Sequence, residues 1–170
     1  MKQLILGGAR SGKSKIAEKL ANESGKQVIY IATGEVKDDE MQKRIHHHQK
    51  QRPSSWQTVE EPIMLANVLK KHDVNNVCLL VDCLTLWVTN CLLNANAMCW
   101  VEQRNALLDV LSSLQADIIF VSNEVGQGIV PLGEINRQFV DETGFLHQTL
   151  AQQCERVSFI VAGLPQLLKS

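Results

Sequence analysis

The eight residues Gly7-Gly8-Ala9-Arg10-Ser11-Gly12-Lys13-Ser14 constrain the fold of this chain more than any other segment. They form a complete G-x-x-x-x-G-K-S pattern. A short apolar run precedes them and a segment of helical period follows. Glycines let successive backbone N–H groups face inward, and the start of the helix adds its partial positive charge. The pattern therefore predicts a strand–loop–helix unit that holds the phosphates of a nucleoside triphosphate.

Short β-branched or apolar runs alternate with longer helical segments along the rest of the chain. The expected strands are Gln3–Leu6, Gln27–Ala32, Val77–Val81, Ile118–Ser122 and Val157–Ala162. The expected helices are Lys13–Glu23, Asp39–Gln51, Pro62–Lys71, Leu84–Leu93, Val101–Leu114 and Glu134–Gln153. The strands are continuous hydrophobic runs, which is typical of strands covered on both faces. This order predicts an α/β fold with a mostly parallel sheet flanked by helices, and ligand binding beyond the carboxyl ends of the strands.

Length and composition exclude several classes of protein. The 170 residues fit a single domain spanning 1–170. A formal net charge of −1 provides no broad cationic surface, so nucleic-acid binding is not expected. The longest apolar runs are only about five residues, against the ~20 that a membrane span needs. The five cysteines form no C-x-x-C pair. We therefore expect reduced, mostly buried cysteines and a cytoplasmic location.

Several side chains extend the predicted phosphate site. Lys13 is expected to contact the outer phosphates, and the hydroxyl of Ser14 to ligate Mg²⁺. Asp82 closes an apolar strand and is a candidate for holding the metal through water. The alternative is that it only caps the helix that follows, and both roles are compatible.

A further polar pair, Asn123-Glu124, follows another expected strand. The same carboxyl edge is therefore expected to carry it. The glycines of the next segment, 125–131, indicate either a backbone shaped around a ligand or a plain surface turn.

The three consecutive histidines 46–48 lie in a segment that begins with acidic and ends with basic residues, an order that favours a helix. At about 100° per residue, only His48 shares the face of Met41 and Ile45. Adjacent histidines are a poor metal site, because ligand pairs on a helix need i, i+3 or i, i+4 spacing. His48 therefore either packs against the apolar face or acts as a nucleophile toward phosphorus, with Arg52 balancing the charge. The spacing leaves both interpretations open.

A specific series of motifs runs along nearly the whole chain: Gly7–Ser14, Tyr30–Gly34, Asp38–Met41, Arg44–His48, Arg52, Trp56, Thr58–Pro62, Asp82–Thr85, Asn123–Gly126 and Val161–Pro165. In this order, the series resembles the bifunctional adenosylcobinamide kinase/adenosylcobinamide-phosphate guanylyltransferase family of cobalamin biosynthesis. The phosphate loop alone is shared by many families. The combination with the acidic helix start and the later His, Arg, Trp and Glu positions is much more specific.

The resemblance implies two reactions. First, ATP or GTP phosphorylates the aminopropanol hydroxyl of adenosylcobinamide. Second, GTP transfers GMP to a histidine with loss of pyrophosphate, and adenosylcobinamide phosphate then takes the GMP. The matching histidine is His48, with Lys13 as the second catalytic residue. The implied nucleotide contacts are Gly7, Gly8, Ala9, Arg10, Ser11, Gly12, Lys13, Ser14, Ala32, Thr33, Gly34, Gln49, Lys50, Gln51, Arg52, Glu60 and Asp82.

The resemblance also implies Mg²⁺ at Ser14 and Asp82, and a homo-oligomer, a trimer or larger, in which one subunit completes the site of another. Gln49 stands where the family often has lysine, so one phosphate contact differs. Two other interpretations stay open from the residues alone. In one the chain is an ordinary P-loop kinase of small molecules in which His48 only packs. In the other it is a nucleotide switch or scaffold without catalysis.

Overall fold

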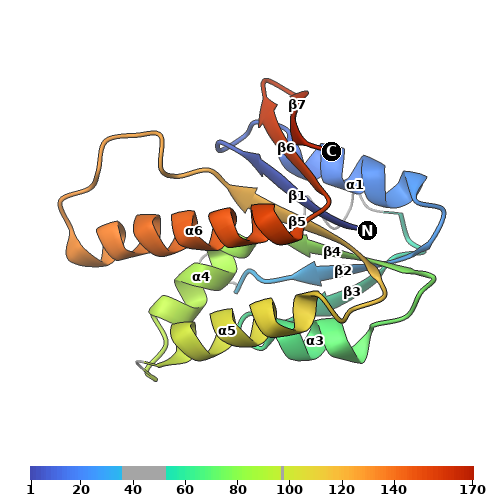
Figure 1. Ribbon diagram of the computed structural model, residues 1–170, viewed down its shortest axis with the longest axis horizontal. Coiled ribbons are helices and arrows are strands. Elements are labelled where there is room, and N and C mark those ends of the chain that lie inside the picture. The colour runs from blue at the N-terminus through green and yellow to red at the C-terminus, as the bar shows by residue number, and fades with distance from the viewer. Residues whose placement is uncertain (36–52, 97) are drawn as a thin grey trace.

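The structure, a computed structural model, describes residues 1–35, 53–96 and 98–170. Its strands form one seven-stranded sheet in the order β3-β2-β4-β5-β1-β6-β7 (Figure 1). All neighbouring strands are parallel except β6 and β7, which form an antiparallel hairpin. The strands are β1 Lys2–Gly7, β2 Gln27–Ala32, β3 Gln57–Glu60, β4 Val77–Asp82, β5 Asp117–Asn123, β6 Arg156–Val161 and β7 Leu164–Lys169.

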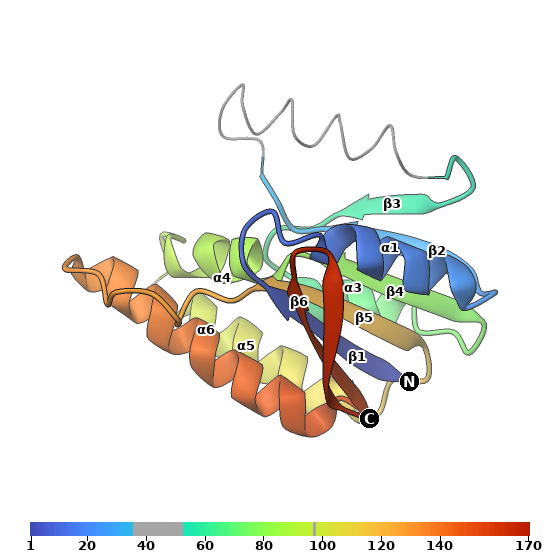
Figure 2. The same ribbon diagram turned by 90° about the horizontal axis from the view of Figure 1, so that it is seen from above.

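Helices cover both faces of the sheet (Figure 2). The described helices are α1 Lys13–Glu23, α3 Leu65–Lys71, α4 Leu84–Leu92, α5 Cys99–Leu111 and α6 Glu134–Gln153. Buried residues of α1 pack in one apolar cluster with one face of the sheet. Buried residues of α3, α4, α5 and α6 pack in a second cluster on the other face. The predicted α/β fold with a mostly parallel sheet flanked by helices is thus confirmed. Among the described helices, none is both long and apolar enough to cross a membrane.

The expected elements agree closely with the observed ones. All five expected strands are present, and the ends of the five expected helices that can be compared differ by at most three residues. The helix expected from Pro62 begins only at Leu65, because the Glu61 carboxylate accepts the N–H groups of Ile63 and Met64 and holds them in a turn. The helix expected at Asp39–Gln51 lies outside the described residues.

Two edge strands were not expected. β3 has only four residues and is largely polar, so it lacks the apolar run that marks a buried strand. Every residue of β7 is exposed, and Pro165 interrupts its pattern. Proline is tolerated on an edge strand, where its missing N–H faces no partner. These two strands therefore form by pairing with the neighbour that the core already holds in place.

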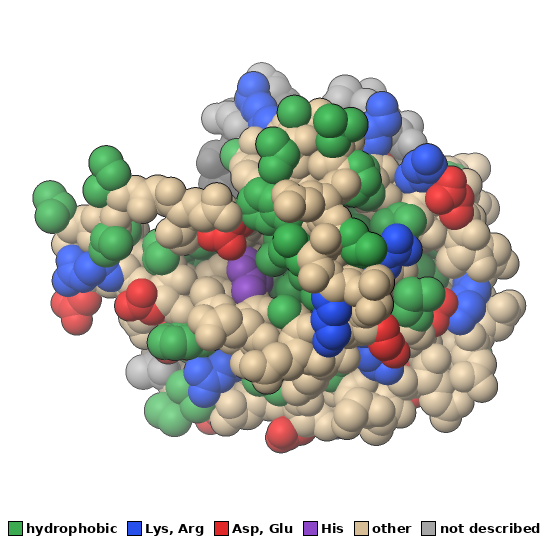
Figure 3. Space-filling model, turned by 45° about the horizontal axis from the view of Figure 1, so that its top comes forward, with side chains coloured by type: hydrophobic (Ala, Val, Ile, Leu, Met, Phe, Trp, Pro, Cys, Tyr) green, Lys and Arg blue, Asp and Glu red, His purple; other side chains and the backbone are tan. Residues whose placement is uncertain are grey.

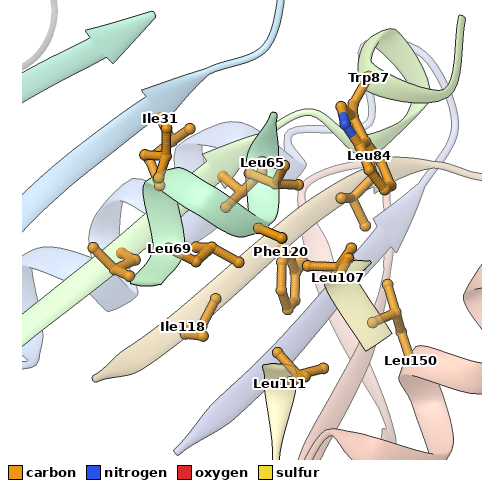
Figure 4. Packing of buried hydrophobic residues seen from close by; sticks show 14 of the residues in the cluster. Ile31, Leu65, Leu69, Leu84, Trp87, Leu107, Leu111, Ile118, Phe120 and Leu150 are labelled. Carbon is orange, nitrogen blue, oxygen red and sulfur yellow. The ribbon is translucent and has the colours of Figure 1, made fainter. Parts of the chain in front are cut away.

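The larger core lies between the sheet and helices α3 to α6 (Figure 4). Trp87 and Phe120 are completely buried there. The indole N–H of Trp87 donates to the Ile63 carbonyl over 2.8 Å, and its ring meets Trp100 edge-on at 5.4 Å between centroids. All five cysteines are buried and free, as expected for reduced thiols.

Phe120→Ala tests this core. Phe120 is fully buried on β5, so truncation removes apolar contacts and leaves a cavity. We expect a loss of about 3–5 kcal/mol in the free energy of unfolding, measured by urea denaturation. Phe145→Ala, on the 59% exposed Phe145 of α6, is the matched control and should change stability by less than about 0.5 kcal/mol. Equal losses in both variants would contradict this description of the core.

Candidate active site at the carboxyl edge of the sheet

The phosphate loop, Gly7–Ser14, joins β1 to α1. Gly12 is the N-cap of α1, with a left-handed φ of 95° and no side-chain cap hydrogen bond. Arg10 is also left-handed, with a φ of 57°. Within the loop, the Ser11 N–H donates to the Gly8 carbonyl over 3.2 Å. Because no side chain caps α1, its first N–H groups are available to an anion, as the sequence pattern predicts.

The turn of the β6–β7 hairpin supports the loop from one side. The Gly163 N–H donates to the Ser11 carbonyl over 2.8 Å. A Cβ at Gly12 would lie 3.2 Å from the Cα of Gly163, and a Cβ at Gly7 would lie 2.7 Å from the Ile160 carbonyl oxygen. Close backbone contacts therefore require glycine at both positions, and at Gly12 the left-handed φ requires it as well. This contact between the hairpin turn and the loop is not predicted from the sequence. The glycine at position 163 is a turn signal, but it does not indicate which segment the turn contacts.

Lys13 is a buried cation at the centre of the site. It is 7% exposed, and its Nζ donates to the Gly8 carbonyl over 3.1 Å. Burial lowers the pKa of Lys13, and the nearby acidic groups of Cys83 and Asp82 oppose this shift. In the same loop the buried Oγ of Ser11 has no hydrogen-bond partner within the described part of the chain. A bound triphosphate would supply an anion to the Lys13 ammonium and a hydrogen-bond acceptor to the Ser11 hydroxyl.

The sheet brings the other described nucleotide-site candidates to the same edge. Ala32 is in register with Asp82 on one side and with Glu60 on the other, so Thr33 and Gly34 follow β2 at this edge. Asp82 does not cap α4, because the N-cap residue is Cys83 and it makes no side-chain cap hydrogen bond.

The strand between Asp82 and the phosphate loop is β5. Its last residue, Asn123, is in register with Gly7, and its amide donates to the Thr85 hydroxyl over 2.8 Å. Thr33 donates in turn to the Cys83 carbonyl over 2.7 Å, and Asn90 donates to the Thr33 carbonyl over 2.7 Å. These bonds fix the backbone around the Asp82 strand end.

Two groups of predicted residues are not part of this geometry. His48 and the four residues that follow it, Gln49 to Arg52, lie outside the described residues. The segment 125–133 is an irregular loop with strongly exposed apolar side chains, Ile129 at 98% and Leu132 at 96%. The structure therefore places the loop, Ala32 to Gly34, Glu60 and Asp82 along the same carboxyl edge of the sheet.

Comparison with known proteins decides the family. Residues 3–168 match the family described as cobinamide kinase / cobinamide phosphate guanyltransferase. The chain belongs to this family. It is 56% identical to the bifunctional adenosylcobalamin biosynthesis protein CobP of Pseudomonas aeruginosa, over 99% of this chain and 98% of that one. It is 37% identical to the bifunctional adenosylcobalamin biosynthesis protein CobU of Escherichia coli K12, over 98% of each chain.

The cobinamide kinase/guanylyltransferase fold is shared more widely. The RadB recombinase structure superposes with a TM-score of 0.51 at 17% identity, over 93% of this chain and 73% of that one, which indicates a common fold alone. The family assignment confirms the resemblance drawn from the motifs. The chain is a bifunctional kinase and guanylyltransferase of cobalamin biosynthesis, rather than an ordinary small-molecule kinase or a nucleotide switch.

Gly12→Ala tests the conformation of the phosphate loop. An L-residue in the left-handed region costs roughly 1–2 kcal/mol, and the new Cβ would press on Gly163. We expect GTP affinity, measured by titration calorimetry, to fall about tenfold or more. Gly144→Ala, in the middle of α6 with no atom within 4 Å of the new Cβ, is the control. It should leave affinity unchanged and stabilise the helix by up to about 1 kcal/mol. Unchanged binding by the Gly12 variant would contradict the conformation described here.

Proposed function

We propose that this enzyme carries out its two reactions on one bound triphosphate site, the phosphate loop. In the first, ATP or GTP phosphorylates the aminopropanol hydroxyl of adenosylcobinamide. In the second, GMP passes from GTP to His48 and then to adenosylcobinamide phosphate, which gives adenosylcobinamide-GDP. The observation that carries this proposal is the buried ammonium of Lys13 inside an uncapped loop of backbone N–H groups. That arrangement suits a polyanion, and both reactions expel one.

Lys13 and the loop have the same task in both reactions. The kinase reaction releases a nucleoside diphosphate and the guanylyltransferase reaction releases pyrophosphate. In each case negative charge grows on a phosphate oxygen that leaves. Lys13 and the N–H groups at the start of α1 are fixed before the substrate binds, so they stabilise this charge without reorganising. We propose that the remaining loop residues, with Ala32, Thr33, Gly34, Glu60 and Asp82, complete the nucleotide contacts.

The residues of this site are suited to binding Mg²⁺ together with the triphosphate. Ser14, in the first turn of α1, and Asp82 offer a hydroxyl and a carboxylate, the hard oxygen donors that Mg²⁺ prefers. Within residues 1–35, 53–96 and 98–170, no group of three or more His, Cys, Asp and Glu side chains is placed to hold a metal ion by itself. We therefore propose that Ser14 ligates the ion directly and Asp82 through water, with phosphate oxygens as further ligands. When bound, the ion supplies positive charge next to the leaving phosphates.

His48 is our proposed nucleophile for the GMP transfer. A neutral imidazole can attack the α-phosphorus of GTP, and the resulting phosphoramidate divides one difficult transfer into two easier ones. The chain leaves β2 at the edge that carries the phosphate loop, and Ala32 to Gly34 lie there. This supports delivery of the following segment to the nucleotide. We propose that Lys50 and Arg52 balance the phosphate charge and that Gln49 and Gln51 add polar contacts.

Incubation with GTP labelled on the α-phosphate tests the covalent step. We expect acid-labile label on the wild-type protein in the presence of Mg²⁺, and its loss on chasing with adenosylcobinamide phosphate. His48→Asn should remove the label and keep the kinase reaction, because phosphorylation of a hydroxyl needs no histidine intermediate. His46→Asn and His47→Asn are matched controls and should both be labelled. Label that survives in His48→Asn would show that another residue is the nucleophile.

We also propose that the enzyme is a homo-oligomer, a trimer by family resemblance. Apolar side chains gather over the projecting 125–133 loop and over the β6–β7 hairpin (Figure 3). Leu164 is 71% exposed on the edge strand β7, in addition to the loop residues Ile129 and Leu132. Exposed apolar groups and a free strand edge of this kind are usually covered by a partner. This supports a second copy on these surfaces.

Light scattering after size exclusion tests the assembly. We expect a mass of about three times the 19.0 kDa chain at micromolar concentration. Ile129→Ser combined with Leu132→Ser should shift the mass toward one chain, because the loop loses the apolar area that a partner would bury. Val74→Ser, on a 56% exposed valine next to α3, is the control and should leave the mass unchanged. A wild-type protein that elutes as one chain would contradict this proposal.

We propose further that residues 1–170 act as one domain in the cytoplasm. One sheet takes strands from Lys2 at one end of the sequence to Lys169 at the other, which supports a single unit. The five free, buried cysteines are typical of a reducing compartment.

A further inference from the structure

Glu124 lies at the phosphate loop although neither the motif nor the nucleotide contacts discussed above include it. It follows β5 directly, and its backbone N–H donates to the Gly7 carbonyl over 3.0 Å. Its side chain is 21% exposed. An acid is therefore tied by its main chain to the first residue of the loop that holds the triphosphate, with part of its carboxylate open to a ligand.

The carboxylate of Glu124 accepts one backbone hydrogen bond and faces a buried histidine. One oxygen, Oε1, accepts the Gly126 N–H over 2.5 Å. The other, Oε2, lies 3.9 Å from Nδ1 of His147, a buried residue of α6. Nε2 of the same ring lies 2.6 Å from Oγ of Ser122, which is fully buried on β5.

The contact between Ser122 and His147 bears on which ring nitrogen of His147 carries the hydrogen. Burial lowers the pKa of His147, and Glu124 opposes that shift, so the neutral ring is favoured. If the Ser122 hydroxyl donates to Nε2, then Nδ1 carries the hydrogen and directs it toward the Glu124 carboxylate. The His147 ring, bonded to Ser122, thus faces the Glu124 carboxylate across 3.9 Å at the edge of the loop.

Other acids at this edge have different tasks. Glu61 accepts the N–H groups at the start of α3 and is occupied there. Glu60 ends β3, which β2, β4 and β5 separate from β1 in the sheet. Asp82 lies two strands from β1 and is the proposed metal residue. Of these four acids, Glu124 is the one whose backbone N–H donates to the phosphate loop.

The two reactions of this family differ in whether a proton must be removed. The kinase acceptor is a hydroxyl, which has a proton to lose as its oxygen bonds to phosphorus. The guanylyltransferase acceptor is a phosphate monoester, whose second pKa is about 6, so at neutral pH it is already largely ionised. A carboxylate beside the loop is therefore useful to the first reaction and dispensable in the second.

We propose that Glu124 is the proton acceptor of the kinase reaction and that His147 is its positioning residue. The proposal rests on the kinase activity of the family. The substrate oxygen forms a bond to the γ-phosphorus. The bond from that phosphorus to the β,γ-bridging oxygen breaks, and its electron pair leaves with the nucleoside diphosphate. The hydroxyl proton passes to Oε2 of Glu124 and then to solvent.

Glu124→Gln tests the assignment by comparing the two reactions in one protein. We expect kcat for phosphorylation of adenosylcobinamide to fall at least about 100-fold, the usual scale for loss of a general base. The KM for GTP should stay within about threefold. Labelling from α-labelled GTP and transfer to adenosylcobinamide phosphate should keep wild-type rates, which also shows that the variant folds. Glu23→Gln, at the far end of α1 and exposed, is the matched control and should leave both reactions unchanged.

His147→Gln separates a positioning role from simple packing. We expect a fall of about tenfold in kinase kcat with little change in KM. The double variant with Glu124→Gln should be no slower than Glu124→Gln alone, because the histidine acts only through the carboxylate.

Three results would overturn the assignment: a kinase rate in Glu124→Gln near that of wild type, equal loss of both reactions, or additive losses in the double variant. A wild-type protein without kinase activity would instead contradict the family activity itself.

Discussion

The ammonium of Lys13 is the group on which the rest of the site depends. A lysine that is 7% exposed loses most of its hydration, and burial lowers its pKa. Its Nζ donates to the Gly8 carbonyl, which is a weaker partner for a cation than a phosphate. The loop conformation must therefore keep this ammonium in position to bind a phosphate. Two glycines of the loop, Gly7 and Gly12, accordingly lie against backbone atoms of β6 and of the β6–β7 turn.

Two neighbours hold the loop in that shape, one on each side of β1. On the β6 side, the Gly163 N–H bonds to the Ser11 carbonyl. On the β5 side, the Glu124 N–H bonds to the Gly7 carbonyl. Both bonds join main-chain atoms, so the side chain of Glu124 remains available for chemistry. The parallel register of β2, β4 and β5 brings Asp82 to the same edge. The hydrophobic core thus positions the site through the strands that it packs.

The parts of the fold that carry a local sequence signal could be predicted. The glycine pattern and the helical period after it located the loop and α1, whose bounds agree with the prediction. Apolar runs located the five inner strands because both their faces are buried. β3 and β7 lack such runs, since they lie at the edges of the sheet and form through pairing. His147 contacts Ser122 only because the tertiary fold brings α6 against the sheet, and no local pattern in either segment indicates that contact.

The two reactions of this family differ mainly in what approaches the nucleotide, and the architecture is suited to that difference. In our proposals, a triphosphate held by Lys13 and the start of α1 offers its γ-phosphorus to one nucleophile and its α-phosphorus to another. In our proposals the hydroxyl that attacks the γ-phosphorus gives its proton to Glu124, which follows β5. The histidine that attacks the α-phosphorus comes from the segment after β2. Because β4 lies between β2 and β5, the proposed proton acceptor and the proposed histidine nucleophile come from different strands of one sheet. In these proposals, one set of positive charges around the phosphates serves both reactions, and the choice between them depends on which acceptor is bound.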